Sequence, residues 1–128
     1  MLVALGTVLV LCGLVVASGC AKYNTFYNAK KWFDQAERAR EEAIEQGSDV
    51  ETASRGQRQN YMRAIDKAKK ILREHPGHDL TDDALFLLGK SYQRLASYRE
   101  SIRHLGSLLR RFGAAGFLEE SVLLQAVH

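Results

Sequence analysis

The chain has 128 residues, 46% of them hydrophobic and 26% charged, and its 18 basic and 15 acidic side chains give a formal net charge of +3. This length suits one small domain, and a positive balance this weak does not favour a nucleic-acid-binding protein. The sequence holds no Gly-rich phosphate loop and no recognisable Ser, His and Asp set. We therefore expect neither an enzyme nor a protein with a bound cofactor or a small-molecule substrate.

The N-terminal segment is predicted to be an export signal. Residues 2–19 carry no charged side chain and end in small residues at positions 17–19, just before Cys20. This ending, Ala-Ser-Gly-Cys, resembles the bacterial lipobox, which implies cleavage before the cysteine and a lipid on the Cys20 thiol. Cys12 would be lost with the signal, so no disulfide is expected. We predict a lipoprotein signal peptide at residues 1–19.

An uncleaved transmembrane anchor is the alternative interpretation of the same segment. Its length lies at the lower edge of what spans about 30 Å of hydrocarbon. No Lys or Arg precedes the apolar run, although a signal peptide normally begins with a basic region. We therefore expect Met1 to be an internal start or a truncated end.

A first helix is predicted directly after Cys20, with Gly47 as its end. Its aromatic residues could form a membrane-interface belt, but we favour packing against the next hairpin. If Ala29 matches Gly89 of the later hairpin, this segment is the first helix of repeat one. The residues assigned to one face of it are Tyr23, Phe26, Tyr27, Lys30, Phe33, Ala36, Arg40 and Ala43.

A polar segment at residues 45–59 follows and is predicted to be a loop with a frayed helical extension. Ser48 with Glu51 is a candidate capping box, in which two side chains satisfy the free N–H groups of a helix start. The second helix is therefore expected to begin near Asp49 or at Asn60. It should end before Pro76, because proline disfavours helical geometry in the residue before it.

The loop around residues 75–83 is rich in metal-ligand side chains, but their spacing matches neither a zinc nor a calcium motif. We expect no metal there. Thr81 is instead expected to cap the next helix, with Leu80 as a hydrophobic staple and two aspartates at the positive end of the helix dipole. The candidate ligands considered are His75, His78, Asp79, Asp82 and Asp83.

Residues 82–112 form the one complete helical hairpin of the sequence. Apolar side chains recur at the three-and-four spacing of two amphipathic helices. Ser97 followed by Glu100 is a capping box that predicts a turn at Ala96-Ser97. An offset of 37 residues places Tyr61 on Tyr98, so the unit repeats, which is typical of stacked hairpins.

The same hairpin resembles the tetratricopeptide repeat, with Gly89 and Ser101 at the two small positions where the helices of such a repeat approach closely. The residues that carry the resemblance are Leu85, Leu88, Gly89, Tyr92, Tyr98, Ser101, Leu105 and Leu108. The terminal Pro of the pattern is Gly113 here. The resemblance implies an all-α fold, a solenoid of antiparallel helical hairpins.

The expected domain at residues 20–128 then has three parts. Hairpin one covers about residues 22–76 with the polar insertion at 45–59, and hairpin two covers residues 82–112. The first helix of a third repeat is expected at residues 118–128, without its partner helix. We therefore expect the chain to be the front portion of a longer protein.

In tetratricopeptide repeats the first helix of each unit lines a concave groove that holds peptides or protein segments. When the repeat pattern is aligned on Gly89, the resemblance implies a protein-binding groove of mixed apolar and charged character. The groove residues expected in the complete hairpin are Asp83, Phe86, Lys90, Gln93 and Arg94.

The combination of an acylated cysteine, an aromatic-rich first helix and long-period repeats is similar to the outer-membrane assembly lipoproteins of the BamD type. This implies a periplasmic scaffold that is lipid-anchored through Cys20 and binds a barrel-forming partner. Ala21 favours the outer membrane, since Asp there would retain the lipoprotein in the inner one. Two alternatives stay open, a repeat lipoprotein of another envelope process such as cell-wall synthesis or division, and the docking module of a larger periplasmic enzyme.

Overall fold

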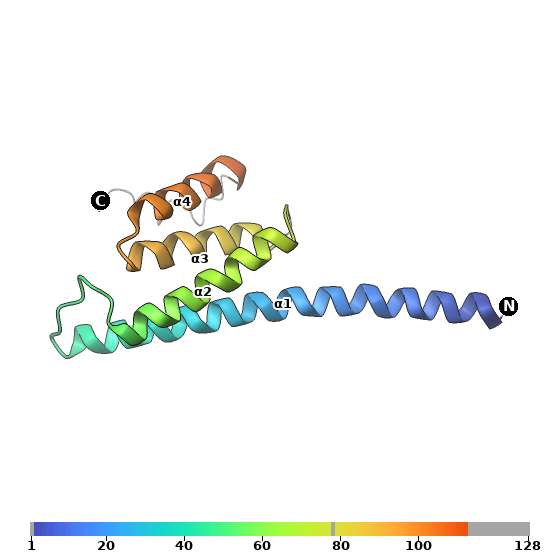
Figure 1. Ribbon diagram of the computed structural model, residues 1–128, viewed down its shortest axis with the longest axis horizontal. Coiled ribbons are helices and arrows are strands. Elements are labelled where there is room, and N and C mark those ends of the chain that lie inside the picture. The colour runs from blue at the N-terminus through green and yellow to red at the C-terminus, as the bar shows by residue number, and fades with distance from the viewer. Residues whose placement is uncertain (1, 78, 113–128) are drawn as a thin grey trace.

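The chain is all-α in the computed structural model, as expected from the helical periodicity (Figure 1). The structure describes residues 2–77 and 79–112, without the side chains of residues 2, 5, 7–19 and 112. The third-repeat helix expected at residues 118–128 lies outside them. Within the described residues there are no strands, and the helices are α1 (Leu2–Glu45), α2 (Arg55–Glu74), α3 (Thr81–Arg94) and α4 (Tyr98–Phe112).

Successive helices run antiparallel and pack in chain order. α1 packs along α2, α2 on α3 and α3 on α4, and α1 also reaches α3. The first half of α1 extends away from the other helices as a single rod (Figure 1). At 1.5 Å per residue, the 44 residues of α1 make a helix about 66 Å long. The body of the protein therefore forms around the second half of α1 only.

α1 divides into a buried face and an exposed face. Ala29 and Ala36 are fully buried, whereas Tyr27 is 66% exposed. Tyr27 precedes Ala29 by two residues, which rotates it by about 200° around the helix, to the opposite side. The expected packing of the aromatic residues is therefore correct for Phe26 and Phe33, which pack on the core, and wrong for Tyr27 and for Tyr23, which is 52% exposed.

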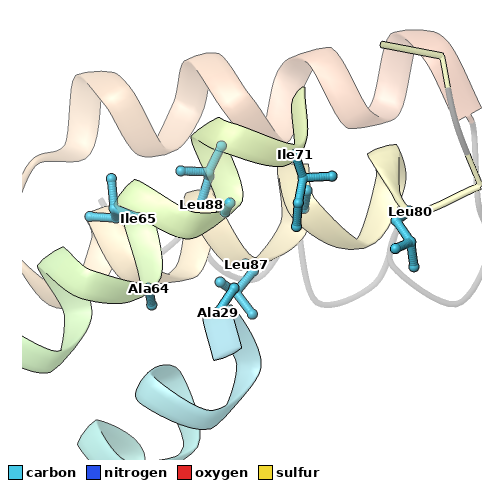
Figure 2. Close-up of a cluster of buried hydrophobic side chains, with 9 residues drawn as sticks. Ala29, Ala64, Ile65, Ile71, Leu80, Leu87 and Leu88 are labelled. Atoms are coloured by element: carbon cyan, nitrogen blue, oxygen red, sulfur yellow. The ribbon is translucent and has the colours of Figure 1, made fainter. Parts of the chain in front are cut away.

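The core lies where α1, α2 and α3 meet (Figure 2). Ala29 on α1 and Ala64 and Ala68 on α2 have no exposed surface, and their small side chains let the two helices approach closely. Larger aliphatic side chains of α2 and α3 fill the remaining space, each stabilising the fold by about 1.5–3 kcal/mol. The buried residues of this cluster are Ala29, Ala64, Ile65, Ala68, Ile71, Leu80, Ala84, Leu87 and Leu88.

The end of α1 and the start of α2 are both set by local hydrogen bonds. Gly47 has a φ of 73°, and the N–H of Ser48 donates to the Ala43 carbonyl, a glycine-terminated helix end as expected. The expected starts of α2 are wrong, because Ser54 caps it. The Ser54 Oγ accepts from the Gln57 N–H at 3.3 Å, and Gln57 Oε1 accepts from the Ser54 N–H at 3.0 Å. This complete capping box satisfies two N–H groups at once.

The loop between α2 and α3 corrects a second expectation. α2 ends at Glu74, before Pro76, as predicted. Thr81 does not cap α3, because the helix begins at Thr81 itself and Leu80 takes the capping position without a side-chain hydrogen bond. Leu80 is 8% exposed and joins the core, so burial of this side chain, rather than a hydroxyl cap, fixes the start of α3. The Thr81 Oγ1 is left buried without a hydrogen-bond partner.

The turn between α3 and α4 lies at the predicted position. α3 ends at Arg94 and α4 begins at Tyr98. Ala96 adopts a left-handed φ of 59°, and the N–H of Ser97 donates to the Tyr92 carbonyl at 2.9 Å. A residue with a side chain is strained in this region, by roughly 1 kcal/mol. The tight turn places α4 directly against α3.

Candidate protein-binding groove between α1 and α3

A hollow of about 150 Å³ opens between α1 and α3 and contains three of the expected groove residues. Asp83, Phe86 and Lys90 lie on α3 at intervals of three and four residues, so they share one face of the helix. α1 supplies the facing wall. The lining residues are Phe26, Lys30, Phe33 and Asp34 from α1, with Asp83, Phe86, Leu87 and Lys90 from α3.

The hollow has an aromatic floor with charges around it. The Lys90 ammonium lies 5.6 Å from the ring centre of Phe86 and 5.9 Å from that of Phe33, within the range of cation–π attraction. Lys30 pairs with Asp34 at 2.8 Å on the α1 side. Burial, and then the neighbouring charge of Asp82, raises the pKa of Asp83. Positively and negatively charged side chains therefore border a surface of aromatic rings.

Close contact between α3 and α4 fixes the position of the α3 wall. Gly89 is buried, and a Cβ built on it would overlap the Leu105 side chain. The Ser101 hydroxyl donates to the Gly89 carbonyl at 2.8 Å, inside the interface. The two small residues expected at the close approach of the helices are thus in contact. Their packing orients the groove face of α3 toward α1.

Arg94, also expected in the groove, is held by a carboxylate of α1. Its Nε donates to Glu37 Oε1 at 2.8 Å and its Nη2 donates to Glu37 Oε2 at 3.0 Å. The Tyr61 hydroxyl of α2 donates to the same Oε1 at 2.6 Å. These three residues, the Glu37 cluster, join α1, α2 and α3. Neither Arg94 nor Gln93 lines the hollow between α1 and α3.

The electrostatics of the Glu37 cluster favour its charged form. Burial alone would raise the pKa of the Glu37 carboxyl, but hydrogen bonds from Arg94 and Tyr61 and the Arg94 charge hold it below its usual value. Burial and the bond to Glu37 raise the pKa of the Tyr61 hydroxyl. Removing one partner of such a half-buried ion pair leaves the other charge unpaired, which lowers the free energy of unfolding. The cluster therefore holds the helices together and is not available to a ligand.

The α1 wall of the groove was missed by sequence reasoning, although a signal for it exists. The match of Ala29 with Gly89 also places Phe26 on Phe86 and Lys30 on Lys90. The pattern Phe-x-x-small-Lys thus occurs once on each wall of the hollow. Phe33 and Asp34 have no counterpart of the same type on α3, and only the structure brings them to the site.

Cys20, the expected lipidation residue, is an exposed free thiol on α1. α1 passes through this residue without interruption. Two residues later the helix is tied to the α2–α3 loop, where Lys22 lies 3.5 Å from Asp79 Oδ1 and the Tyr23 hydroxyl donates to Asp79 Oδ2 at 2.8 Å. The folded body therefore begins immediately after the expected attachment point.

Two further observations concern membranes and metals. Among the described residues, no helix contains a stretch long and apolar enough to cross a membrane. The side chains of residues 7–19, which form most of the expected signal sequence, are outside the described part. Within that same part, no three His, Cys, Asp or Glu side chains gather as metal ligands, and His78 lies outside it.

Fold and site together define an all-α protein with a groove between its first and third helices. Comparison of the chain with models of protein families, with curated proteins and with solved structures gives no significant match.

Proposed function

We propose that this chain is a binding scaffold that holds an extended protein or peptide segment in the groove between α1 and α3. The observation that carries the proposal is the pair of facing walls with the same pattern, Phe26 and Lys30 on α1 and Phe86 and Lys90 on α3. In a tetratricopeptide-type solenoid the first helices of successive hairpins line the binding face. α1 and α3 hold these positions in the proposed array.

The size and chemistry of the hollow favour a peptide side chain over a whole small molecule. Its volume of about 150 Å³ is below the roughly 300–1,000 Å³ typical of small-molecule pockets. An apolar side chain fits on the rings of Phe33 and Phe86. Lys90 suits an acidic neighbour in the same peptide, and Asp83 can accept from a peptide amide. One apolar anchor with flanking polar contacts is how grooves of this kind select extended segments.

The proposed setting is the bacterial cell envelope, with the protein anchored by a lipid on Cys20 at the periplasmic face of the outer membrane. The support is the Ala-Ser-Gly-Cys ending of the uncharged run, the exposure of Cys20 and the short distance in sequence from Cys20 to the folded body. In the setting of the BamD-type lipoproteins, the bound partner is a protein of the β-barrel assembly process. The role is binding and not catalysis.

The groove is tested by peptide binding to the purified full chain in detergent. The probes are fluorescein-labelled short peptides in which a single Phe, Leu or Ala is flanked by Glu, and the readout is fluorescence anisotropy. Phe and Leu peptides should bind more tightly than the Ala peptide. Phe86→Ala should weaken their binding by about tenfold, or 1.4 kcal/mol.

The matched control is Met62→Ala, because Met62 is an exposed apolar residue of α2 outside the hollow. This variant should bind the peptides like the unchanged protein. If Phe86→Ala bound the peptides as tightly as the unchanged protein, the binding site would have to lie elsewhere on the protein. Arg94 is not suitable for this test, because its substitution would also disturb the Glu37 cluster.

The lipid anchor is tested separately in bacterial cells. Cys20→Ser should abolish the incorporation of labelled palmitate and release the protein from the membrane fraction. Labelling that persists in this variant would contradict the lipobox assignment. The peptide-binding test does not depend on this result.

A further inference from the structure

The exposed side of α1 carries a continuous row of side chains that begins at Cys20. Its members are spaced three or four residues apart, so they lie on one face of the helix. This face is opposite the one that buries Ala29 and Ala36 in the core. The residues of this row, the outer row, are Cys20, Asn24, Tyr27, Lys31, Gln35 and Arg38, and all of them are exposed.

The outer row is ordered from aromatic to basic along the helix. Tyr27 is 66% exposed, and Tyr23, on the edge of the row, is 52% exposed. The next charged members are Lys31 and Arg38, both basic and exposed. Amphipathic tyrosine rings suit the headgroup level of a bilayer, and basic side chains suit anionic lipid.

The negative charges on this part of α1 are paired with basic side chains. Between residues 20 and 40 the acidic side chains are Asp34 and Glu37. Asp34 borders the outer row beside Lys31 and Arg38, and its charge is paired with Lys30 at 2.8 Å. Glu37 is held by Arg94. Exposed acidic residues appear on α1 from position 41 onward. The charge of α1 thus changes from positive near the attachment point to negative at its far end.

The start of this row is also fixed in orientation. Lys22 and Tyr23 both contact Asp79 of the α2–α3 loop, so α1 cannot turn freely against the body at this point. A lipid on Cys20 would therefore present a defined side of the molecule to the bilayer. Tyr27 lies about 10 Å further along the helix axis from Cys20.

We propose that the outer row rests on the anionic phospholipid headgroups of the bilayer to which the protein is attached. The proposal depends on the membrane attachment at Cys20 put forward above. Tyr23 and Tyr27 lie among the headgroups, and Lys31 and Arg38 contact lipid phosphates. The groove between α1 and α3 adjoins the outer row at Lys30 and Asp34, whereas its rings Phe26 and Phe33 lie on the core side of α1. A bound peptide and the membrane therefore contact the helix at the same time.

Lysine footprinting of the full chain tests this contact without any substitution. The protein is reconstituted in vesicles of phosphatidylcholine with phosphatidylglycerol, or of phosphatidylcholine alone. An amine-reactive reagent that does not cross membranes is added, and labelling is read by mass spectrometry. Lys31 should be labelled several-fold less in the anionic vesicles than in the neutral ones. Lys69, an exposed lysine of α2, is the internal reference and should not change.

A matched pair of charge reversals identifies the lipid-facing side. Arg38→Glu should restore Lys31 labelling in anionic vesicles by roughly fivefold, the effect of about one basic contact with anionic lipid. Arg58→Glu makes the same change of charge on an exposed position of α2 and should leave Lys31 protected.

Each other outcome contradicts the proposal in a distinct way. Equal labelling of Lys31 and Lys69 in protein that sediments with the vesicles would show that the row faces water. Equal protection of Lys31 in neutral and anionic vesicles would rule out the contact with anionic headgroups. Protection in native envelopes but not in vesicles would assign the row to a protein partner. A chain that does not sediment with vesicles would overturn the attachment as well, whereas peptide binding in the groove would stand.

Discussion

The groove between α1 and α3 and the Glu37 cluster both involve α1 and α3, yet they differ in whether their ion pair joins the helices. In the groove, Lys30 and Asp34 pair within α1, and a hollow remains between the helices. In the cluster, Glu37 accepts from both Arg94 and Tyr61 across three helices. The comparison indicates that residues on one face of α3 divide into a binding part and a structural part.

The strongest test of this division removes the central carboxylate. Glu37→Ala leaves the Arg94 guanidinium half-buried without its partner and deprives the Tyr61 hydroxyl of its acceptor. We expect a loss of about 3 kcal/mol in the free energy of unfolding, measured by urea denaturation. Asp83→Ala, which removes a carboxylate in the groove, is the matched control and should cost less than about 1 kcal/mol. Equal losses in the two variants would contradict the division.

The close contact behind the groove wall gives the next largest effect. Gly89→Ala places a methyl group against Leu105, which is fully buried and has little room to move. We expect a loss of about 2 kcal/mol in unfolding free energy, as is typical of overpacking. Peptide binding should also weaken, because α3 must shift to accommodate the methyl group.

A second variant separates strain from other effects of Gly89→Ala. The double variant Gly89→Ala with Leu105→Ala should lose less unfolding free energy than the sum of the two single variants, because Leu105→Ala removes the atoms that overlap the new methyl group. Additive losses would show that the contact does not limit the position of α3.

The sequence is informative about features that depend on near neighbours in the chain. Gly47, Pro76 and the Ser97 turn set helix ends by local geometry, and each was predicted at or next to its observed place. Asp83, Phe86 and Lys90 could be assigned to one face of α3 because they are spaced three and four residues apart, and all three line the hollow. Alignment of Ala29 with Gly89 also places Phe26 on Phe86 and Lys30 on Lys90, and both Phe26 and Lys30 line the hollow from α1.

Features that depend on distant partners were not predictable from the sequence. Glu37 meets Arg94, 57 residues away, and nothing in the local pattern distinguishes Arg94 from an exposed groove residue. Thr81 is a good capping residue by type, but the burial of Leu80 decides where α3 begins. The aromatic residues of α1 are so closely spaced that periodicity alone did not separate Phe26, which packs against the core, from exposed Tyr27.

Opposite responses to acid should distinguish the two regions. The pKa of Glu37 is lowered from 4.5, so its contribution to stability is complete above that value and is lost as the pH falls through the lowered pKa. The pKa of Asp83 is raised from 3.8, so its ionised form costs stability and protonation relieves that cost as the pH falls.

The measurement is the unfolding free energy between pH 7 and pH 3 in two isosteric variants. Glu37→Gln should make the decline toward acid shallower, by on the order of 1 kcal/mol over the range. Asp83→Asn should make it steeper, by a smaller amount. A steeper decline in Glu37→Gln would reverse the sign argued for the cluster.

The smallest expected effect lies outside both regions, in the turn between α3 and α4. Ala96 has a φ of 59°, a conformation that glycine adopts without strain, and it is exposed, so no packing is lost when its methyl group is removed. Ala96→Gly should therefore raise the unfolding free energy by about 0.5 kcal/mol, the relief of strain less the added freedom of the unfolded chain. Peptide affinity should stay unchanged, because α3 keeps its contact with α4 through Gly89 and Ser101. A change in affinity without a change in stability would mean that the groove depends on the turn itself, and the division of α3 into binding and structural parts would then have to include residues beyond its end.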